Sequence, residues 1–240
     1  MGNPVKLRTK VKKIAEFGRD MYDVWLEPLG RKPRFKAGQF LHLALDDYDP
    51  SGGFWPESRV FSIASSPDED CIRIIFSVKG SFTSRMRKEI IAEKEIWVKL
   101  PYGTFVIDEL SSINKDIVLV AGGTGISPYL AWLAKLKENS GHVTLHYGVR
   151  QNSFIVPGLS IASWIDTRLY VEDEEPKESI IPVDKSYRGR LSIEKTFAQP
   201  HDGIHSVYFL SGPPQMIKNF SSGLSKCGVP SENIRIDEWE

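Results

Sequence analysis

The sequence has few cysteines, and this excludes several kinds of protein. Only two of its 240 residues are cysteine, Cys71 and Cys227, and they lie far apart in the chain. A disulfide framework, a zinc site or a cysteine-ligated iron–sulfur cluster within this chain is therefore not expected. We interpret both cysteines as ordinary core or surface thiols and expect no metal site.

The sequence also has no excess of charge of either sign. Lys and Arg number 31, Asp and Glu number 31, and the formal net charge is zero at pH 7. Nucleic-acid binders generally carry a basic excess, so we expect no nucleic-acid partner. The first 36 residues are locally basic, with ten Lys or Arg against four Asp or Glu. This local excess indicates either a docking patch for an acidic partner or ordinary solvated strand faces.

Long apolar runs are absent as well. No run approaches the roughly 18 residues that a membrane-spanning helix needs. The basic N-terminus lacks the apolar segment of a signal peptide. We therefore expect a cytoplasmic protein without membrane insertion. A chain of 240 residues is long enough for one large domain or two of ordinary size.

The most informative stretch is a short apolar run followed by glycines. Residues Ile117–Ala121 are apolar and partly β-branched, which is typical of a strand buried on both faces of a parallel sheet. The segment Gly122–Gly125 contains three glycines, which lack a Cβ that would hold a ligand away from the backbone. Ser127 and Pro128 suit the N-cap and the first position of a helix. The stretch predicts either an anion site at a helix start or a tight turn without a ligand.

The two halves of the chain have different patterns. Up to about Asp108, short strand-like runs and one helix favour a small antiparallel β-barrel. From about Asp116, buried strand-like runs alternate with helices or loops, as in a doubly wound sheet. The loop Asp108–Lys115 is the natural boundary. We therefore expect a barrel domain over 1–110 and an α/β domain with a five-stranded parallel sheet over 115–240.

The expected elements have the following bounds. In the first half, the strands are Val11–Phe17, Met21–Leu29, Ala37–Leu45, Arg59–Ala64, Cys71–Val78 and Ile96–Leu100, and the helix is Thr83–Ala92. In the second half, the strands are Ile117–Ala121, Val143–Tyr147, Leu169–Val171, Val207–Leu210 and Ile234–Ile236. Turn residues follow several of the second set of strands, and ligands of such sheets bind at that edge.

Six short motifs, in order along the chain, resemble those of the ferredoxin–NADP reductase superfamily of flavoproteins. They are Arg59–Ser62, Gly80–Met86, Pro101–Phe105, Gly122–Pro128, Ser211–Pro214 and Asp237–Trp239. The likeness runs over nearly the whole chain. It implies a flavin-binding barrel and a nucleotide-binding α/β domain, with FAD as the cofactor in preference to FMN. NAD(P)H is the implied hydride donor.

The resemblance also assigns residues to the flavin. They are Arg59, Val60, Phe61, Ser62, Gly80, Thr83 and Ser84. Arg59 can donate charge-assisted hydrogen bonds to a flavin phosphate, and Phe61 would lie flat against the isoalloxazine. Ser62 would face the ring edge near the reactive nitrogen. Thr83 and Ser84 suit a second phosphate at a helix start, although an ordinary N-cap explains them equally well.

A second set of residues is assigned to the nicotinamide nucleotide. They are Gly122, Gly123, Thr124 and Gly125 along the pyrophosphate, and Ser211 and Gly212 at the nicotinamide. Trp239 would stack on the flavin face that nicotinamide must reach, and Asp237 would accept hydrogen bonds beside the ring or from Ser211. Hydride transfer needs the rings about 3–3.5 Å apart, so the protein mainly positions them. The candidate catalytic residues are Ser62, Ser211, Asp237 and Trp239.

The predicted activity is transfer of electrons from NAD(P)H through FAD to a separate one-electron carrier, ferredoxin or flavodoxin, which would dock on the basic N-terminal domain. Phe61 stands where the family usually has Tyr, and Ser211 where it usually has Cys. NAD(P)H:flavin reductases of the same superfamily resemble the Phe61 motif. A reductase that releases reduced flavin is therefore the alternative, and a non-catalytic nucleotide-binding module is a third.

The sequence does not decide whether NADH or NADPH is the preferred nucleotide. A 2′-phosphate needs cationic partners, and Arg150 and Arg168, which flank the second and third predicted strands of the α/β half, are candidates. The acidic turn Glu172–Glu175 is close enough in sequence to oppose them. Both arginines are explained equally well as structural residues.

Overall fold

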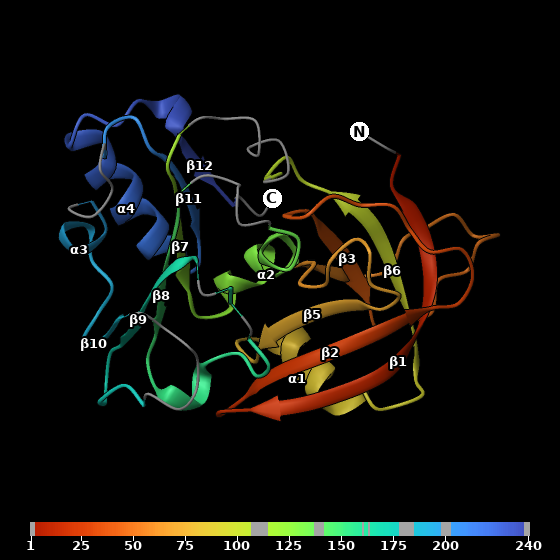
Figure 1. Cartoon of the computed structure of the whole chain (residues 1–240). Helices are drawn as coiled ribbons and strands as arrows, with labels where there is room; N and C mark the ends of the chain where they lie inside the picture. The colour runs from red at the N-terminus through yellow and green to blue at the C-terminus, as the bar shows by residue number, and fades with distance from the viewer. Residues whose placement is uncertain are drawn as a thin grey trace. The chain divides into compact units, whose positions relative to one another are not determined.

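The structure, a computed structural model, describes residues 3–106, 115–136, 142–159, 161–162, 164–177, 185–197 and 203–237. The chain divides into two compact units (Figure 1). One is Met1–Asp108 with Ser127–Trp132, and the other is Glu109–Ile126 with Leu133–Glu240. The predicted boundary loop lies, apart from Lys115, outside the described residues.

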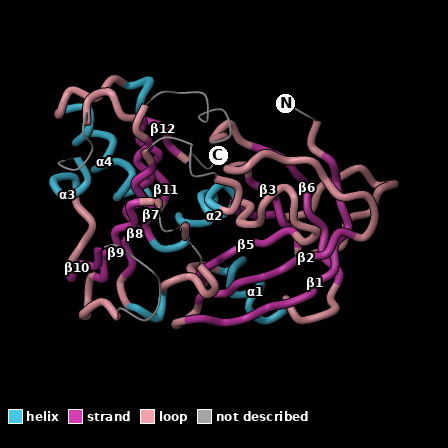
Figure 2. The backbone as a smooth tube through the Cα atoms, viewed as in Figure 1, coloured by secondary structure: helices cyan, strands magenta, loops and turns pink. Residues whose placement is uncertain are grey.

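The first unit contains a six-stranded antiparallel sheet in the order β4-β3-β6-β1-β2-β5 (Figure 2). The strands are β1 Val5–Phe17, β2 Met21–Pro28, β3 Phe40–Ala44, β4 Ser58–Ser62, β5 Ile72–Ser77 and β6 Glu95–Tyr102. The N–H of Ala64, just after β4, donates to the carbonyl of Arg73 on β5 over 2.8 Å. This bond links the two ends of the sheet, so the predicted barrel is confirmed.

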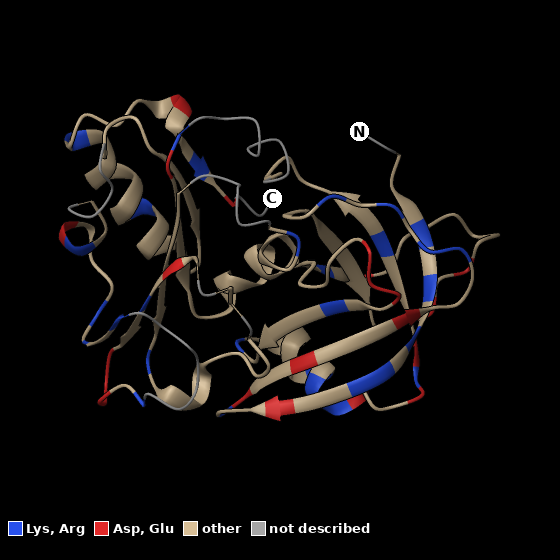
Figure 3. Ribbon diagram, viewed as in Figure 1, with Lys and Arg blue, Asp and Glu red and all other residues tan. Residues whose placement is uncertain are grey.

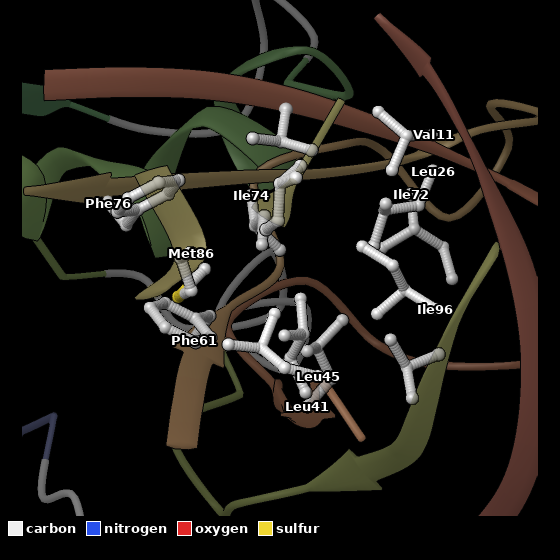
Figure 4. Close-up of a cluster of buried hydrophobic side chains, with 14 of the residues drawn as sticks. Val11, Leu26, Leu41, Leu45, Phe61, Ile72, Ile74, Phe76, Met86 and Ile96 are labelled. Atoms are coloured by element: carbon white, nitrogen blue, oxygen red, sulfur yellow. The ribbon is translucent and has the colours of Figure 1, made fainter. Parts of the chain in front are cut away.

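The barrel core follows from alternation along the strands. On β6, Ile96, Val98 and Leu100 are buried, while the residues between them face outward. Helix α1, Ser81–Glu89, adds Phe82 and Met86 to the same core. Figure 4 shows Met86 beside side chains of the barrel strands. The helix therefore supports one end of the barrel through the same hydrophobic cluster.

The second unit contains a parallel sheet of six strands, in the order β10-β9-β8-β7-β11-β12. The strands are β7 Ile117–Gly122, β8 Val143–Val149, β9 Asp166–Val171, β10 Lys185–Arg188, β11 Val207–Ser211 and β12 Ile234–Ile236. The prediction of five strands was wrong, because it missed a sixth strand, β10. This strand lies at the edge of the sheet, and its sequence Lys-Ser-Tyr-Arg has no buried residue and no apolar alternation. An edge strand of this kind gives no signal in the sequence.

Strand β7 lies inside the parallel sheet between β8 and β11, and all six of its residues are buried. Helix α4, Pro214–Lys226, buries Phe220 and Leu224 in a cluster that includes Val118 and Val120 of β7. The short helix α3, Ile193–Phe197, has Ile193 and Phe197 packed against the same cluster. Because both faces of β7 are covered, only its carboxyl end is open to carry a ligand-binding turn.

A buried ion pair joins two barrel strands. Arg73 on β5 donates from Nε to Oδ1 of Asp23 over 2.7 Å and from Nη2 to Oδ2 over 2.9 Å. The two side chains are 11% and 7% exposed, and the guanidinium lies 5.1 Å from the centre of the Trp25 ring. Bidentate geometry and little water make this pair costly to break.

We predict that Asp23→Ala lowers the free energy of unfolding by about 3–5 kcal/mol, because Arg73 loses two charge-assisted hydrogen bonds where water cannot replace them. Urea denaturation followed by tryptophan fluorescence measures this. Glu27→Ala is the matched control, since the Lys12–Glu27 pair on the same barrel is 58% and 43% exposed and its loss should cost less than about 1 kcal/mol. Equal effects of the two substitutions would contradict the prediction.

Candidate functional site

The glycine-rich turn follows β7 directly and is itself helical. A 3-10 turn spans Gly123–Ile126 and helix α2 spans Ser127–Leu133. Gly123 has a positive φ of 55°, which reverses the chain after the strand. The prediction of Ser127 as an N-cap was therefore wrong. The helical backbone already begins at Gly123, and Ser127 is 3% exposed within it.

This turn packs against the turn that follows the neighbouring strand β11. In the sheet, Ala121 is the register partner of Ser211. A Cβ on Gly125 would lie 2.3 Å from the carbonyl oxygen of Ser211 and 2.6 Å from the amide nitrogen of Gly212. A Cβ on Gly122 would lie 2.7 Å from the sulfur of Met216. The two turns therefore touch backbone to backbone, which only glycine permits.

Gly123 differs from these glycines. Among the described residues, no atom comes within 4 Å of a Cβ built on it. The packing of the two turns therefore explains Gly122 and Gly125 without any ligand, while the space beside Gly123 is open to one. Thr124, the remaining predicted pyrophosphate residue, is partly exposed beside it.

The carboxyl ends of β11 and β12 carry a buried polar pair. Ser211 donates from Oγ to Oδ2 of Asp237 over 2.9 Å, and the two residues are 0% and 3% exposed. The Asp237 N–H donates to the carbonyl of Leu210 over 2.9 Å, which holds the chain after β12 against β11. The structure thus brings Ser211, Gly212 and Asp237 to the same sheet edge as the glycine-rich turn. Trp239 lies outside the described residues.

The two candidate arginines for a 2′-phosphate differ in the structure. Arg168 is 4% exposed and forms an ion pair with Asp166, which favours the alternative that it is a structural residue. The Arg168 guanidinium already pairs with the Asp166 carboxylate, and the sheet covers it. Arg150 is exposed after β8, and its carbonyl accepts the N–H of Asp173 over 2.9 Å. Arg150 therefore remains the candidate cation at this edge.

The acidic turn beside Arg150 is held in place by hydrogen bonds and ion pairs. Glu174 accepts the N–H of Asn152 over 2.6 Å, and Glu175 pairs with Arg188 over 3.0 Å. Glu172 pairs with Arg190 and raises the pKa of that guanidinium. The sequence did not predict these partners, because they lie on β10 and in other loops and are distant in sequence.

One buried histidine of the sheet was not singled out from the sequence. His146 on β8 is 0% exposed, and its Nδ1 lies 3.1 Å from the hydroxyl of Tyr170 on β9. Burial lowers the pKa of His146 to about 3 and raises the pKa of Tyr170 to about 12. Both side chains are neutral near pH 7 and supply no proton there.

In the first unit, the structure places Arg59 over the start of helix α1. Its guanidinium carbon lies 5.0 Å from the centre of the Phe82 ring, and half of the side chain is exposed. Nη1 donates to the carbonyl of Ser58 and Nη2 to the carboxylate of Glu57, each over 2.9 Å. Glu57 was not predicted from the sequence as a partner, although it stands two positions before Arg59. A phosphate on Arg59 would have to displace this carboxylate.

The first turn of α1 has no side-chain cap. Its N-cap is Gly80, and none of the described atoms lies within 4 Å of a Cβ built there. The Thr83 hydroxyl instead accepts the N–H groups of Lys79 and Gly80, over 2.9 and 3.1 Å. Thr83 thus holds the turn itself, and the Ser84 N–H donates to the Gly80 carbonyl. The helix N–H groups, the open space at Gly80 and the Arg59 cation together suit an anion.

The remaining flavin residues lie further along β4. Phe61 is 7% exposed, and its ring lies edge-on to Phe76 at 6.3 Å in the barrel core (Figure 4). The stacking predicted for Phe61 therefore requires its ring to be uncovered when a flavin binds. Ser62 is 2% exposed and is the register partner of Phe40, while Val60 is partly exposed.

The described residues offer few other places for a ligand. No group of three or more His, Cys, Asp or Glu side chains in these ranges could hold a metal ion. No helix in them is long and apolar enough to cross a membrane. Two open grooves of 680 and 590 Å³ lie on the first unit, beside Trp25 and beside Phe35, and no predicted site residue lines either one.

Comparison with known proteins identifies similar reductases, although no protein-family model matches the sequence. The chain is 26% identical over 218 residues to reductase component 1 of terephthalate 1,2-dioxygenase from Comamonas, covering 88% of this chain and 61% of that protein. It is 28% identical over 257 residues to the reductase component of propane 2-monooxygenase from Rhodococcus jostii, covering 99% and 65%. The chain thus spans less than two thirds of these relatives.

Solved structures share the fold. A cytochrome P450 reductase from Amycolatopsis matches with a TM-score of 0.80 and 21% identity, over 98% of this chain and 70% of the other. A ferredoxin NADP⁺ reductase from Neisseria gonorrhoeae with bound FAD and NADP matches with a TM-score of 0.75 and 17% identity, over 98% of each chain. The homologues and structural neighbours are ferredoxin reductase-like, which confirms the resemblance predicted from the motifs.

We predict that Gly125→Ala destabilises the second unit by about 1–3 kcal/mol, because the new methyl group would meet the backbone of Ser211. Thermal or urea unfolding measures the change. Gly52→Ala is the control, since its methyl group would meet only the exposed Asp49 carboxylate at 3.3 Å. A Gly125→Ala protein as stable as the control would show that the two turns do not pack as described.

Proposed function

We propose that this chain is an NAD(P)H-dependent flavoprotein reductase, which takes a hydride onto FAD and passes electrons singly to a separate protein. The observation that carries the proposal is that motifs far apart in the sequence meet in space within each unit. Arg59 lies over Phe82 at the start of α1, and Gly125 touches Ser211 across the edge of the parallel sheet. Each contact joins two of the sequence motifs that resemble those of flavoprotein reductases.

The barrel residues fit a flavin phosphate. Arg59 would exchange the carboxylate of Glu57 for a phosphate oxygen, and the N–H groups at the start of α1 would donate to the same anion. Gly80 leaves room there, because a Cβ at this position would contact none of the described atoms. FAD, when bound, accepts a hydride from NAD(P)H and releases its electrons one at a time.

The edge of the parallel sheet fits the nicotinamide nucleotide. The open side of Gly123 lets a pyrophosphate approach the backbone. The Ser211 hydroxyl is oriented by its bond to Asp237 but is 0% exposed. A carboxamide placed at Gly212 could donate to its lone pairs only after nucleotide binding uncovers it. These residues bind and orient the nucleotide, and hydride transfer itself needs no acid or base from them.

The relatives support the identity of the electron acceptor. Two are named as the reductase components of a dioxygenase and of a monooxygenase. We propose that the acceptor is an oxygenase component or an iron–sulfur protein such as ferredoxin, with flavodoxin as the flavin-containing equivalent. With two cysteines, this chain cannot supply the four thiolates of an iron–sulfur cluster. The acceptor centre therefore lies outside it.

The basic surface proposed for docking of a carrier protein can be restricted to one loop of the first unit. Figure 3 marks Lys and Arg positions along β1 in blue. Many of these cations already have partners on neighbouring strands and loops, for example Lys10 with Glu93 at 2.8 Å and Arg8 with Glu95. The loop Arg31–Lys36 has four Lys or Arg and no Asp or Glu of its own, and of these cations Lys32 pairs with Asp70 over 3.6 Å. We place the docking of an acidic carrier on this loop, and we propose that the enzyme works in the cytoplasm.

The direct test is anaerobic reduction of the purified protein. A yellow protein that keeps stoichiometric flavin through dialysis should lose its absorbance near 450 nm, where oxidised flavins absorb, when NADH or NADPH is added. It should then reduce ferricyanide repeatedly. A protein that binds flavin but oxidises neither nucleotide would contradict the proposed activity. A protein that releases reduced flavin would be the flavin reductase instead.

We predict that Arg59→Ala weakens flavin binding by about one to two orders of magnitude, because charge-assisted hydrogen bonds contribute about 1.5–3 kcal/mol. Flavin fluorescence titration gives the dissociation constants. Arg87→Ala is the control, since Arg87 lies in the last turn of α1, whereas Arg59 lies over the start of that helix, and Arg87 pairs with Asp20 at 2.7 Å. Similar losses for both variants would remove Arg59 from the flavin site.

We predict a preference for NADH of about tenfold in kcat/KM, equivalent to about 1.4 kcal/mol. Arg168 is buried in an ion pair, and the acidic turn Glu172–Glu175 is joined to the backbone of Arg150 by the bond from the Asp173 N–H to its carbonyl. The carboxylates of this turn would disfavour a 2′-phosphate on Arg150. Stopped-flow reduction with each nucleotide measures the ratio. Arg150→Ala should lower kcat/KM for NADPH and leave the value for NADH unchanged. Equal kcat/KM values for NADH and NADPH would contradict the proposal that the acidic turn disfavours NADPH.

A further inference from the structure

The groove beside Trp25 on the first unit has opposite charges on its two walls. It is lined by Lys12, Lys13, Trp25 and residues 68–71, and none of the residues proposed to bind flavin or nucleotide lines it. In the sheet order, β2 lies between β1 and β5. Trp25 on β2 is therefore the floor, with the two lysines of β1 on one side and the acidic segment before β5 on the other.

The Trp25 ring packs on a rigid part of the barrel. Its centre lies 5.1 Å from the guanidinium carbon of Arg73, which is held by the buried ion pair with Asp23. Lys13 and Arg73 are the register partners of Trp25 on the two neighbouring strands. The indole is partly exposed, and covering it with another surface would cost little side-chain freedom. Trp is also one of the residues that contribute most to protein interfaces.

The basic wall is formed by a bulge in β1. The register with β2 shifts between Val11 and Lys13, so that Lys12 and Lys13 are both exposed instead of alternating. Lys12 pairs with Glu27 over 3.3 Å. Lys13 has no carboxylate partner in the part of the chain that the structure describes. Its ammonium group is therefore available to another molecule.

The acidic wall also has an available charge. The Asp70 side chain is fully exposed, and its carboxylate lies 3.6 Å from Nζ of Lys32. An exposed pair of this kind is weak, so Asp70 can exchange Lys32 for another cation. Two strand spacings separate β1 from β5, which places Lys13 and Asp70 about 10 Å or more apart. The two walls therefore do not form ion pairs with each other across the groove.

Opposite charges on the two walls make the groove complementary to itself. In a two-fold dimer, every contact of one residue with another on the partner occurs twice. A two-fold axis beside Trp25 brings the basic wall of one copy against the acidic wall of the other. A uniformly acidic or uniformly basic partner would instead meet like charge on one wall. Net charge far from zero keeps proteins monomeric, and this chain has none.

We propose that this groove is the contact surface of a symmetric homodimer. Trp25 of each copy packs beside Trp25 of the other, and Lys13 of each copy pairs with Asp70 of the other. The inference does not depend on the proposed function, because the contact residues are separate from those proposed to bind flavin and nucleotide.

The test is sedimentation equilibrium of the purified chain over a range of concentrations. The wild type should form dimers that dissociate on dilution and in high salt, which screens exposed ion pairs. Lys13→Glu and Asp70→Lys should each weaken dimerisation by about tenfold or more, because each creates two contacts between like charges in every dimer. Arg19→Glu is the matched control, since Arg19 is 92% exposed between β1 and β2 and does not line the groove.

Mixing the two charge variants separates a lost contact from a folding defect. In a mixed dimer of Lys13→Glu with Asp70→Lys, each position 13 faces an opposite charge at position 70, so both pairs are attractive again. The equimolar mixture should dimerise about as strongly as the wild type, although neither variant does so alone. Trp25→Ala should weaken dimerisation by about 30-fold or more, the effect of losing a dominant interface side chain. The charge variants keep the test independent of this substitution, which also removes the contact with Arg73.

Three results would overturn the inference. One is a wild-type protein that stays monomeric at every concentration. Another is a mixture that associates no better than its two components. The third is a dimer that Lys13→Glu, Asp70→Lys and Trp25→Ala all leave intact, because that dimer would use another surface.

Discussion

The close approach of two backbone turns is the constraint on which the edge of the parallel sheet depends. Strands β7 and β11 are parallel neighbours, so the turns that follow them emerge side by side. They fit only because position 125 has no Cβ to meet the Ser211 carbonyl. Once the turns are in place, Ser211 lies within hydrogen-bond distance of Asp237 at the end of β12. One steric requirement therefore assembles residues from three strands.

In the barrel, the corresponding constraint is closure of the antiparallel sheet. The bond from Ala64 to Arg73 joins the two ends of the sheet, and Arg73 is fixed in turn by its ion pair with Asp23. Helix α1 enters the same core through Phe82, the ring over which Arg59 lies. The core thus determines both where the cation stands and where the helix begins. The proposed anion site would follow from packing that is needed for stability.

Much of this could be predicted from the sequence, because the signals were local. Every predicted strand overlaps an observed one, and the apolar run before Gly122 marks β7 almost residue for residue. Turn and strand motifs were recognised by their residue types and their order along the chain. The meeting of Gly125 with Ser211 is the non-local consequence of that order.

The rest depended on contacts that a local pattern does not encode. Strand β10 is polar and lies at the edge, so it shows no alternation. Arg168 pairs with Asp166 and is covered by the sheet, although it reads as an open cation in the sequence. The helical start at Gly123 replaced the expected cap at Ser127, because the glycine turns the chain sooner. The ring of Phe61 packs in the core against its neighbours on β5 and α1.

In the function proposed above, the two packed turns at the carboxyl edge of β7 and β11 bind a pyridine nucleotide. Hydrogen exchange at the backbone amides, followed by mass spectrometry with and without NADH, tests it most directly. Nucleotide binding should slow exchange in two separate peptides, one covering Gly122–Ile126 and one covering Ser211 and Gly212, with no change in β1 and β2. Unchanged exchange at both turns under saturating NADH, or slower exchange only elsewhere, would contradict it.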